Sequence, residues 1–184
     1  MLFESERDKS AFFSRTDNIC CSHFHRSAEL LYAVRGEKTV WLDSRQYVVK
    51  PGQLLVCPPY AVHLFPACPG AEQIVAAVPA DYCSRFEKFC ETHAPETPVI
   101  DDEDGNLLRL LSALEKTDNE VLFEGIVNCI LGTYMKRVPF RPVKRPPDRS
   151  QIQRIADSID KNYASPIGLE DLASEFGYSP NYLS

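Results

Sequence analysis

The chain has 184 residues, enough for one domain of ordinary size and a second small unit, because domains usually run to about 100–150 residues. Its 44% hydrophobic and 25% charged residues exclude a disordered or fibrous protein, and its net charge of -6 argues against one that coats nucleic acid along its whole surface. No apolar stretch approaches the roughly 20 residues that span a bilayer, and the opening MLFESERDKS lacks the apolar core of a signal peptide. We therefore expect a cytoplasmic protein with no membrane contact.

The cysteine content predicts buried thiols rather than disulfides. The chain has seven cysteines, an odd number, and the expected compartment is reducing. Cys20 and Cys21 stand just before His23 and offer an alternative role as soft metal ligands or a redox switch. Adjacent strand residues point to opposite faces, which argues against the joint use of both thiols.

From about residue 11 to residue 90, short apolar runs alternate with Gly, Pro or polar turns. The runs are LLYAV, TVWL, YVV, LLVC, VHLF and IVAAVP. Their length and their β-branched and aromatic content predict strands of an antiparallel barrel or sandwich. In TVWLD, parity separates Trp41 from Val40 and Leu42 without showing which set faces the interior, so Trp41 is a candidate pocket residue.

Two helices are predicted after the acidic run Asp101–Asp104. Leucines recur at helical spacing over residues 107–114, and the apolar pattern continues over 121–135, with a turn around Lys116 to Asn119 between them. So many apolar residues on short helices need a cover, which we expect to be a second subunit. The alternative is docking on the barrel.

A proline-rich basic linker is predicted over residues 138–149, because PFRPVKRPPDRS cannot continue a helix. The positive charges in and beside it are opposed there only by Asp148; they are Lys136, Arg137, Arg141, Lys144, Arg145 and Arg149. We favour a solvated linker over an arm that contacts phosphates.

The C-terminal segment has helical signals as well. Ile152, Ile155, Ala156 and Ile159 form one apolar face of a helix. After it, the stretch from Leu169 to Phe176 predicts a short helix that Gly177 stops, and Ser179-Pro180 has the chemistry of a new helix start.

HFHRSAE contains a candidate metal site. His23, His25 and Glu29 share parity, so on one strand their side chains project from the same face, and His63 is the fourth candidate. Three imidazoles and a carboxylate suit a divalent transition metal such as Zn, Ni, Fe or Mn, with an open position for ligand. The alternatives are a metal-free polar pocket and a structural polar network.

The spacing of these residues resembles the two sequence motifs of the cupin superfamily, a small β-barrel. The first motif continues to Gly36, and the second runs from Gly52 through Pro58 to His63. Tyr60 stands where the second motif commonly has Gly, and the Asn that often follows its last His is absent. All four ligand positions match, so the resemblance implies a cupin fold with His23, His25, Glu29 and His63 as metal or ligand contacts.

IGLEDLASEFGYSPNYLS resembles the first helix-turn-helix of the AraC family of bacterial transcription regulators. The matching positions are Leu169, Leu172, Ala173, Gly177, Ser179, Pro180, Tyr182 and Leu183. Ala173 allows two helices to approach closely and Gly177 permits a left-handed turn, whereas Gly168 replaces the usual Ser or Thr cap and should cap weakly. The resemblance implies DNA contacts from Ser179, Pro180, Asn181 and Tyr182.

A complete AraC-family member would continue through a second helix-turn-helix, and residues 150–184 are acidic. We therefore expect a truncated DNA-binding domain and weak or no DNA binding by this chain. The predicted organisation is a cupin-type barrel (1–100), a helical dimerisation region (101–137), the linker (138–149) and the partial helix-turn-helix domain (150–184), which makes the fold mostly β with α.

The predicted function is a ligand-responsive, homodimeric transcription regulator that senses a small polar metabolite, as the family resemblance suggests a sugar. Ligand would shift how the DNA-binding domains are presented. The main alternative is a metal-dependent cupin enzyme, an oxygenase or isomerase, using the same four residues. In a third hypothesis the metal itself is the signal, with Cys20 or Cys21 completing its site.

Overall fold

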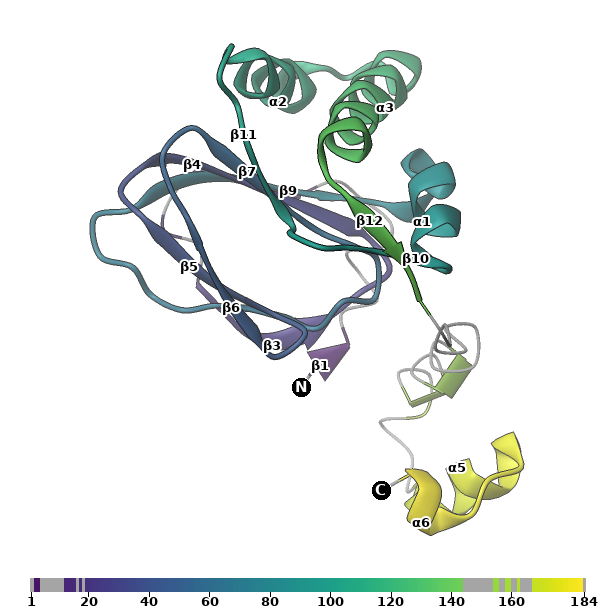
Figure 1. Ribbon diagram of the computed structural model, residues 1–184. Helices are drawn as coiled ribbons and strands as arrows, with labels where there is room; N and C mark the ends of the chain where they lie inside the picture. Colours follow the sequence, from purple (N-terminus) through teal and green to yellow (C-terminus); the bar gives the residue numbers. More distant parts are fainter. Residues whose placement is uncertain are drawn as a thin grey trace. The chain divides into compact units, whose positions relative to one another are not determined.

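A computed structural model describes residues 2–3, 12–15, 17, 19–143, 154–155, 158–159, 162 and 167–183. The chain forms two compact units, residues 1–145 and 146–184 (Figure 1). The predicted linker residues 144–149 and the helix positions Ile152 and Ala156 lie outside the described residues.

The first unit contains two five-stranded sheets. One has the order β1-β3-β8-β5-β6 and the other β11-β7-β4-β9-β2, and the described strands do not join them into one closed ladder. The strands of the first sheet are β1 (Leu2–Phe3), β3 (Cys20–Phe24), β8 (His63–Phe65), β5 (Lys38–Leu42) and β6 (Arg45–Val49). Those of the second are β11 (Val99–Asp101), β7 (Gln53–Cys57), β4 (Ala28–Arg35), β9 (Glu72–Val78) and β2 (Phe12–Ser14). The predicted mostly β fold with helices is confirmed, with two sheets that are not closed into one barrel.

Strand β4 is buried on both faces, which explains its continuous apolar run. Ala28, Leu30 and Tyr32 join a core beneath the helices, whereas Leu31 and Ala33 join a second core between the sheets. Alternate side chains of a strand point to opposite faces, so one strand contributes to both cores. Glu29 shares the parity of Leu31 and therefore points between the sheets.

The orientation of β5 answers the question that parity left open at Trp41. Val40 and Leu42 are buried between the sheets, whereas Trp41 is 40% exposed. Trp41 therefore faces outward and does not line the interior. The hairpin that follows turns at Asp43 and Ser44, both with positive φ (47° and 65°), as a two-residue type I′ turn requires.

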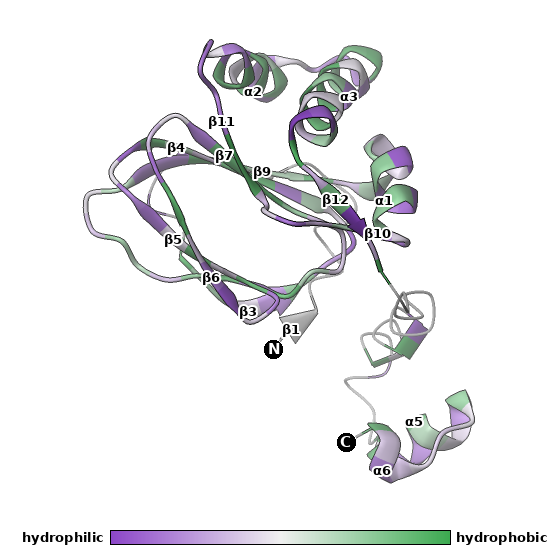
Figure 2. Ribbon diagram, in the orientation of Figure 1, coloured by the Kyte–Doolittle hydropathy of each residue, from purple (hydrophilic) through white to green (hydrophobic). Residues whose placement is uncertain are grey.

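Both predicted helices are present, as α2 (Asn106–Lys116) and α3 (Glu120–Arg137), side by side over the sheet that contains β4, β7 and β9 (Figure 1). Figure 2 shows apolar stretches on these helices and on the strands beneath them. The Asp102 carboxylate begins α2 by accepting hydrogen bonds from the amides of Leu107 and Leu108, both at 3.0 Å. The apolar faces of both helices are therefore covered by the sheet, which is the alternative that the sequence left open. Val121 of α3 nevertheless stays 81% exposed.

The remaining elements of this unit lie beside α3. They are the 3-10 turn η2 (Ala80–Tyr82), α1 (Ser84–Cys90) and a two-stranded sheet of β10 (His93–Pro95) and β12 (Phe140–Pro142). Strand β12 uses residues predicted to be linker, because an edge strand tolerates proline. Among the described residues, none of the helices is long and apolar enough to cross a bilayer.

The second unit contains α5 (Leu169–Phe176) and α6 (Pro180–Leu183), separated by Gly177 at φ 71°. The left-handed glycine stop and the burial of Ala173 agree with the pattern in the sequence. Gly168 offers no side-chain cap; instead its amide donates to the Asp171 carboxylate at 2.8 Å. Ser158, on a preceding helical segment, donates to Glu175 at 2.9 Å and joins that segment to α5.

Candidate metal centre

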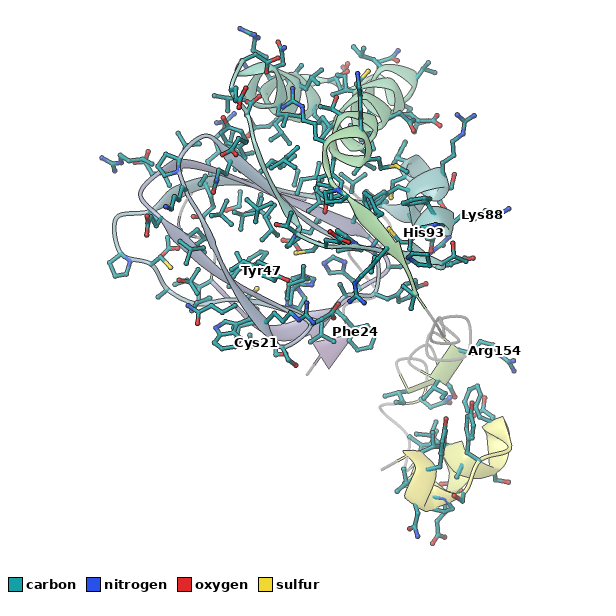
Figure 3. The ribbon with its side chains drawn as sticks, viewed as in Figure 1. Cys21, Phe24, Tyr47, Lys88, His93 and Arg154 are labelled. Carbon is teal, nitrogen blue, oxygen red and sulfur yellow. The ribbon has the colours of Figure 1, made fainter. Side chains whose placement is uncertain are left out.

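Four side chains from three strands and one connecting loop meet between the two sheets. His23 lies on β3, His25 in the β3–β4 connection, Glu29 on β4, and His63 is the first residue of β8. His23 pairs directly with His63 across the β3–β8 ladder, which places residues 40 positions apart next to each other. All four are buried, with at most 2% exposure. Figure 3 labels Cys21 and Phe24 on the strand that carries His23.

The four side chains converge on one point. One potential ligand atom from each lies within 4.8 Å of the others. His25 Nε2 is 3.0 Å and His63 Nε2 is 2.8 Å from Glu29 Oε2, and the His23 and His63 ring centroids are 4.2 Å apart. The structure therefore brings together every residue that the motif predicted.

Backbone carbonyls orient all three imidazoles. His23 Nδ1 bonds to the Cys21 carbonyl at 2.9 Å, His25 Nδ1 to the Ser27 carbonyl at 3.0 Å, and His63 Nδ1 to the Ala61 carbonyl at 2.9 Å. A carbonyl oxygen only accepts, so each Nδ1 carries the proton. In a neutral imidazole, Nε2 then has a lone pair available, which is the tautomer that metal-binding histidines use.

This tautomer makes the contacts with Glu29 informative. If the rings are neutral, the Nε2 lone pairs of His25 and His63 face a carboxylate oxygen at 2.8–3.0 Å, and neither side can donate a hydrogen bond. A proton or a cation must therefore lie between the groups, as a second proton on an imidazole, a proton on the carboxyl group or a bound metal ion. Three Nε2 atoms and a carboxylate at such distances fit a divalent transition metal.

The electrostatics of Glu29 point the same way. Burial raises the pKa of this carboxyl, but the hydrogen bonds with His25 and His63 outweigh burial and lower the pKa well below its ordinary value. An ionised carboxylate buried at this point requires compensating positive charge.

The cysteines beside this group do not form part of it. Cys21 is exposed and contributes only its carbonyl, while Cys20 packs partly buried against the inter-sheet core. The group of potential metal ligands found among the described residues contains no thiol. Cys57, which the motif did not reveal, lies directly opposite Glu29 on β7. Burial, followed by the charge of Glu29, raises the pKa of Cys57 well above its ordinary value and keeps it a thiol.

Tyr60 takes the backbone conformation of the glycine that it replaces. Its φ is 64°, and its amide donates to the His25 carbonyl at 2.8 Å. A side chain in this region costs about 1–2 kcal/mol. The loop that leads to His63 therefore holds a residue in a conformation that glycine adopts more easily.

The predicted DNA contacts lie in the second unit. Ser179, Pro180, Asn181 and Tyr182 are all exposed at the start of α6. The Tyr182 ring stacks on Tyr178 with centroids 4.8 Å apart.

The class of structure defined so far is a two-sheet β fold with three histidines and one glutamate buried between its sheets. Residues 18–78, about a third of the chain, match the family model described as "Cupin domain". The chain thus contains a cupin domain, and the resemblance drawn from its two motifs is confirmed.

Solved structures extend the likeness beyond the cupin domain. A crystal structure of ToxT from Vibrio cholerae matches with a TM-score of 0.56 at 7% identity, covering 92% of this chain and 71% of ToxT. A second, of ToxT with a bound unsaturated fatty acid, gives a TM-score of 0.60 at 8% identity, covering 94% and 69%. The AraC-like transcriptional activator CuxR matches with a TM-score of 0.45 at 15% identity, covering 86% and 59%, a score too low to establish a shared fold. None of the curated proteins matches the chain.

Proposed function

We propose that the chain is the sensor part, and the start of the DNA-binding part, of a ligand-responsive transcription regulator. The observation that carries the proposal is the order of the parts along the chain. A cupin domain comes first, then a helical pair, and then two short helices separated by a left-handed glycine. The cupin domain contains the buried group of His23, His25, Glu29 and His63, called the metal-type group below. The fold shared with ToxT over 92% of this chain supports this order. An enzyme has no evident use for the C-terminal helices.

The sensing site we propose is the His23, His25, Glu29 and His63 group, holding a divalent transition metal. The three imidazoles and the carboxylate would bind the ion, and the ion would supply a Lewis-acid contact for oxygen atoms of an effector. Adjacent hydroxyl or carboxylate oxygens chelate such an ion well, which favours a sugar or a related polar metabolite. ToxT was crystallised with an unsaturated fatty acid, a less polar molecule than the effector proposed here.

The dimer contact we propose uses the exposed start of α3. Val121 is 81% and Leu122 is 54% exposed, next to a face that packs on the sheet. Sedimentation velocity should show a dimer for the wild-type chain, and Val121→Glu with Leu122→Glu should shift it toward monomer. A wild-type monomer at high concentration would contradict this contact.

For DNA, we propose that the exposed residues Ser179 to Tyr182 face the duplex in a longer protein, while this chain binds weakly or not at all. The acidic side chains Glu170, Asp171 and Glu175 on α5 reduce the attraction to phosphates. Tight, sequence-specific binding in a mobility-shift assay would contradict the second part. A cytoplasmic location belongs to the same proposal.

A metal-dependent cupin enzyme is the second candidate, because such an enzyme would need the same four buried side chains as metal ligands. One experiment separates the two. Metal-loaded protein is titrated with a panel of sugars and sugar acids, with thermal stability and ligand consumption followed together. Saturable stabilisation without consumption supports the sensor, whereas steady turnover of a stabilising compound would replace it by the enzyme.

A further inference from the structure

A second polar cluster lies between the sheets, away from the metal-type group. It contains Lys38 of β5, Gln73 of β9, the backbone of Cys68, and Asp17. Leu42 of β5 pairs with His63, and Lys38 lies at the other end of that strand, so roughly 13 Å separates the two clusters along β5. The inter-sheet core, with Val40 in it, fills the space between them.

Lys38 is a fully buried cation. Its side chain has 0% exposure, and it follows the parity of Val40 into the interior. Nζ donates to Asp17 Oδ1 at 2.5 Å and to the Pro66 carbonyl at 2.8 Å. Burying an ammonium group is costly unless an anion and hydrogen-bond acceptors surround it, so this end of the interior is built to hold a negative charge.

Asp17 supplies that charge as a bound carboxylate would. Oδ1 contacts Lys38, and Oδ2 accepts from the Cys68 amide at 2.9 Å. Burial raises the pKa of Asp17, but Lys38, the Cys68 amide and the nearby Gln73 side chain together lower it below the ordinary value. The carboxylate is therefore held as an anion by a cationic donor and a neutral one, with the Gln73 amide close by.

Gln73 adds a buried amide near Asp17 that makes no hydrogen bond of good geometry to it. Its side chain is fully buried, and neither its nitrogen nor its oxygen makes a hydrogen bond of good geometry within the described part of the chain. An unsatisfied buried amide costs about 1–3 kcal/mol, which a second polar ligand group would recover. Asp17, in contrast with Lys38, is 23% exposed and lies outside the strands, so it is the replaceable member of the cluster.

We propose that Lys38, Gln73 and the Cys68 amide form a binding site for a carboxylate group, which Asp17 of the same chain fills until a carboxylate-bearing ligand displaces it. This inference rests on the proposed sensor function in one respect: only then is the bound carboxylic acid the effector. The binding of a carboxylate at this site does not depend on the sensor function.

Chemical rescue tests the site. In Asp17→Ala the donors remain and the carboxylate is gone, so acetate should bind and replace it. For a ligand of four non-hydrogen atoms, a dissociation constant of about 1 mM is a reasonable scale. At about 100 mM, acetate should then raise the Tm of Asp17→Ala by about 5 °C or more over acetamide, its neutral isostere. Wild-type protein and Asp17→Ala with Lys38→Met should show no such difference.

The possible outcomes separate the ideas. Saturable, Lys38-dependent stabilisation by acetate supports the site, and so does a variant that folds only with acetate. Equal effects of acetate and acetamide, or rescue that survives Lys38→Met, overturn it. If Asp17→Ala does not fold in either solution, acetate binding to Asp17→Asn is measured by saturation-transfer NMR, and no binding there also overturns the site. Turnover of a ligand at the metal-type group would refute the proposed sensor function, but it would not change the conclusion about acetate binding at the Lys38 site.

Discussion

The two units of the chain place their functional residues by opposite means. In the first unit, strand pairing brings His23 next to His63 and buries the whole metal-type group. In the second, the predicted DNA contacts lie within one turn of α6 and are exposed, so local turn chemistry positions them. Damage to packing should therefore abolish the site of the first unit, while damage to a turn should stay local in the second.

The largest effect is expected in the core of the first unit. Leu111 of α2 is fully buried, so Leu111→Ala should lower the free energy of unfolding by about 3 kcal/mol through lost burial and a cavity. Lys116→Ala on the same helix is the control, because Lys116 is exposed and its truncation should cost less than about 0.5 kcal/mol. Urea denaturation measures both, and equal losses would mean that the helices do not pack on the sheet as described.

Glu29 should give the first unit a distinct acid sensitivity. Its folded pKa lies below the ordinary value of 4.5, so its contribution to stability is complete above pH 4.5 and is lost progressively as the pH falls further. In metal-free protein, wild-type stability should drop below pH 4.5 more steeply than that of Glu29→Gln. Urea denaturation at each pH measures the free energy of unfolding of both proteins. If the two free energies fall in parallel with pH, the buried carboxylate is not ionised.

The strain at Tyr60 gives a smaller and cleaner effect. Tyr60→Gly and Tyr60→Ala remove the same ring, but only glycine is at ease at φ 64°. The glycine variant should be more stable than the alanine variant by about 1 kcal/mol. Thermal denaturation of the pair measures this difference, and an alanine variant equal to or more stable than the glycine variant would contradict the left-handed conformation.

The smallest effect on the chain as a whole should come from Gly177. Its φ is 71° with open space around the missing Cβ, so Gly177→Ala should destabilise the α5–α6 turn by about 1 kcal/mol through backbone strain alone. Hydrogen exchange should become faster in residues 167–183 and stay unchanged in β4 and β9. Faster exchange in those strands would contradict a purely local effect of this substitution.

The same contrast explains what the sequence could and could not predict. Helical spacing predicted α2 and α3, and a single glycine predicted the end of α5, because these signals are local. The parity argument for His23, His25 and Glu29 assumed one strand and was wrong on that point, because His25 lies between β3 and β4, which belong to different sheets. The cupin motif named the same three residues and added His63. The outward orientation of Trp41, which parity alone left open, was settled only by the arrangement of the sheets.

What the sequence did not reveal depends on the register between distant strands. Cys57 lies opposite Glu29 because β4 pairs with β7, and Lys38 of β5 meets Asp17, which lies outside the strands and 21 positions away in the chain. The carbonyls that orient the imidazoles come from the shapes of connecting loops. A motif states which residues belong to a site, but it does not contain these surroundings.

Metal content tests the central claim most directly. Tag-free protein purified without chelator is compared by elemental analysis with a variant carrying His25→Ala and Glu29→Ala. We predict close to one equivalent of a divalent transition metal in the wild-type chain and almost none in the variant, since half of the group of four ligands is gone. A wild-type chain that stays metal-free after divalent ions are added back, or a variant that retains the same metal, would contradict the assignment of this group as a metal centre.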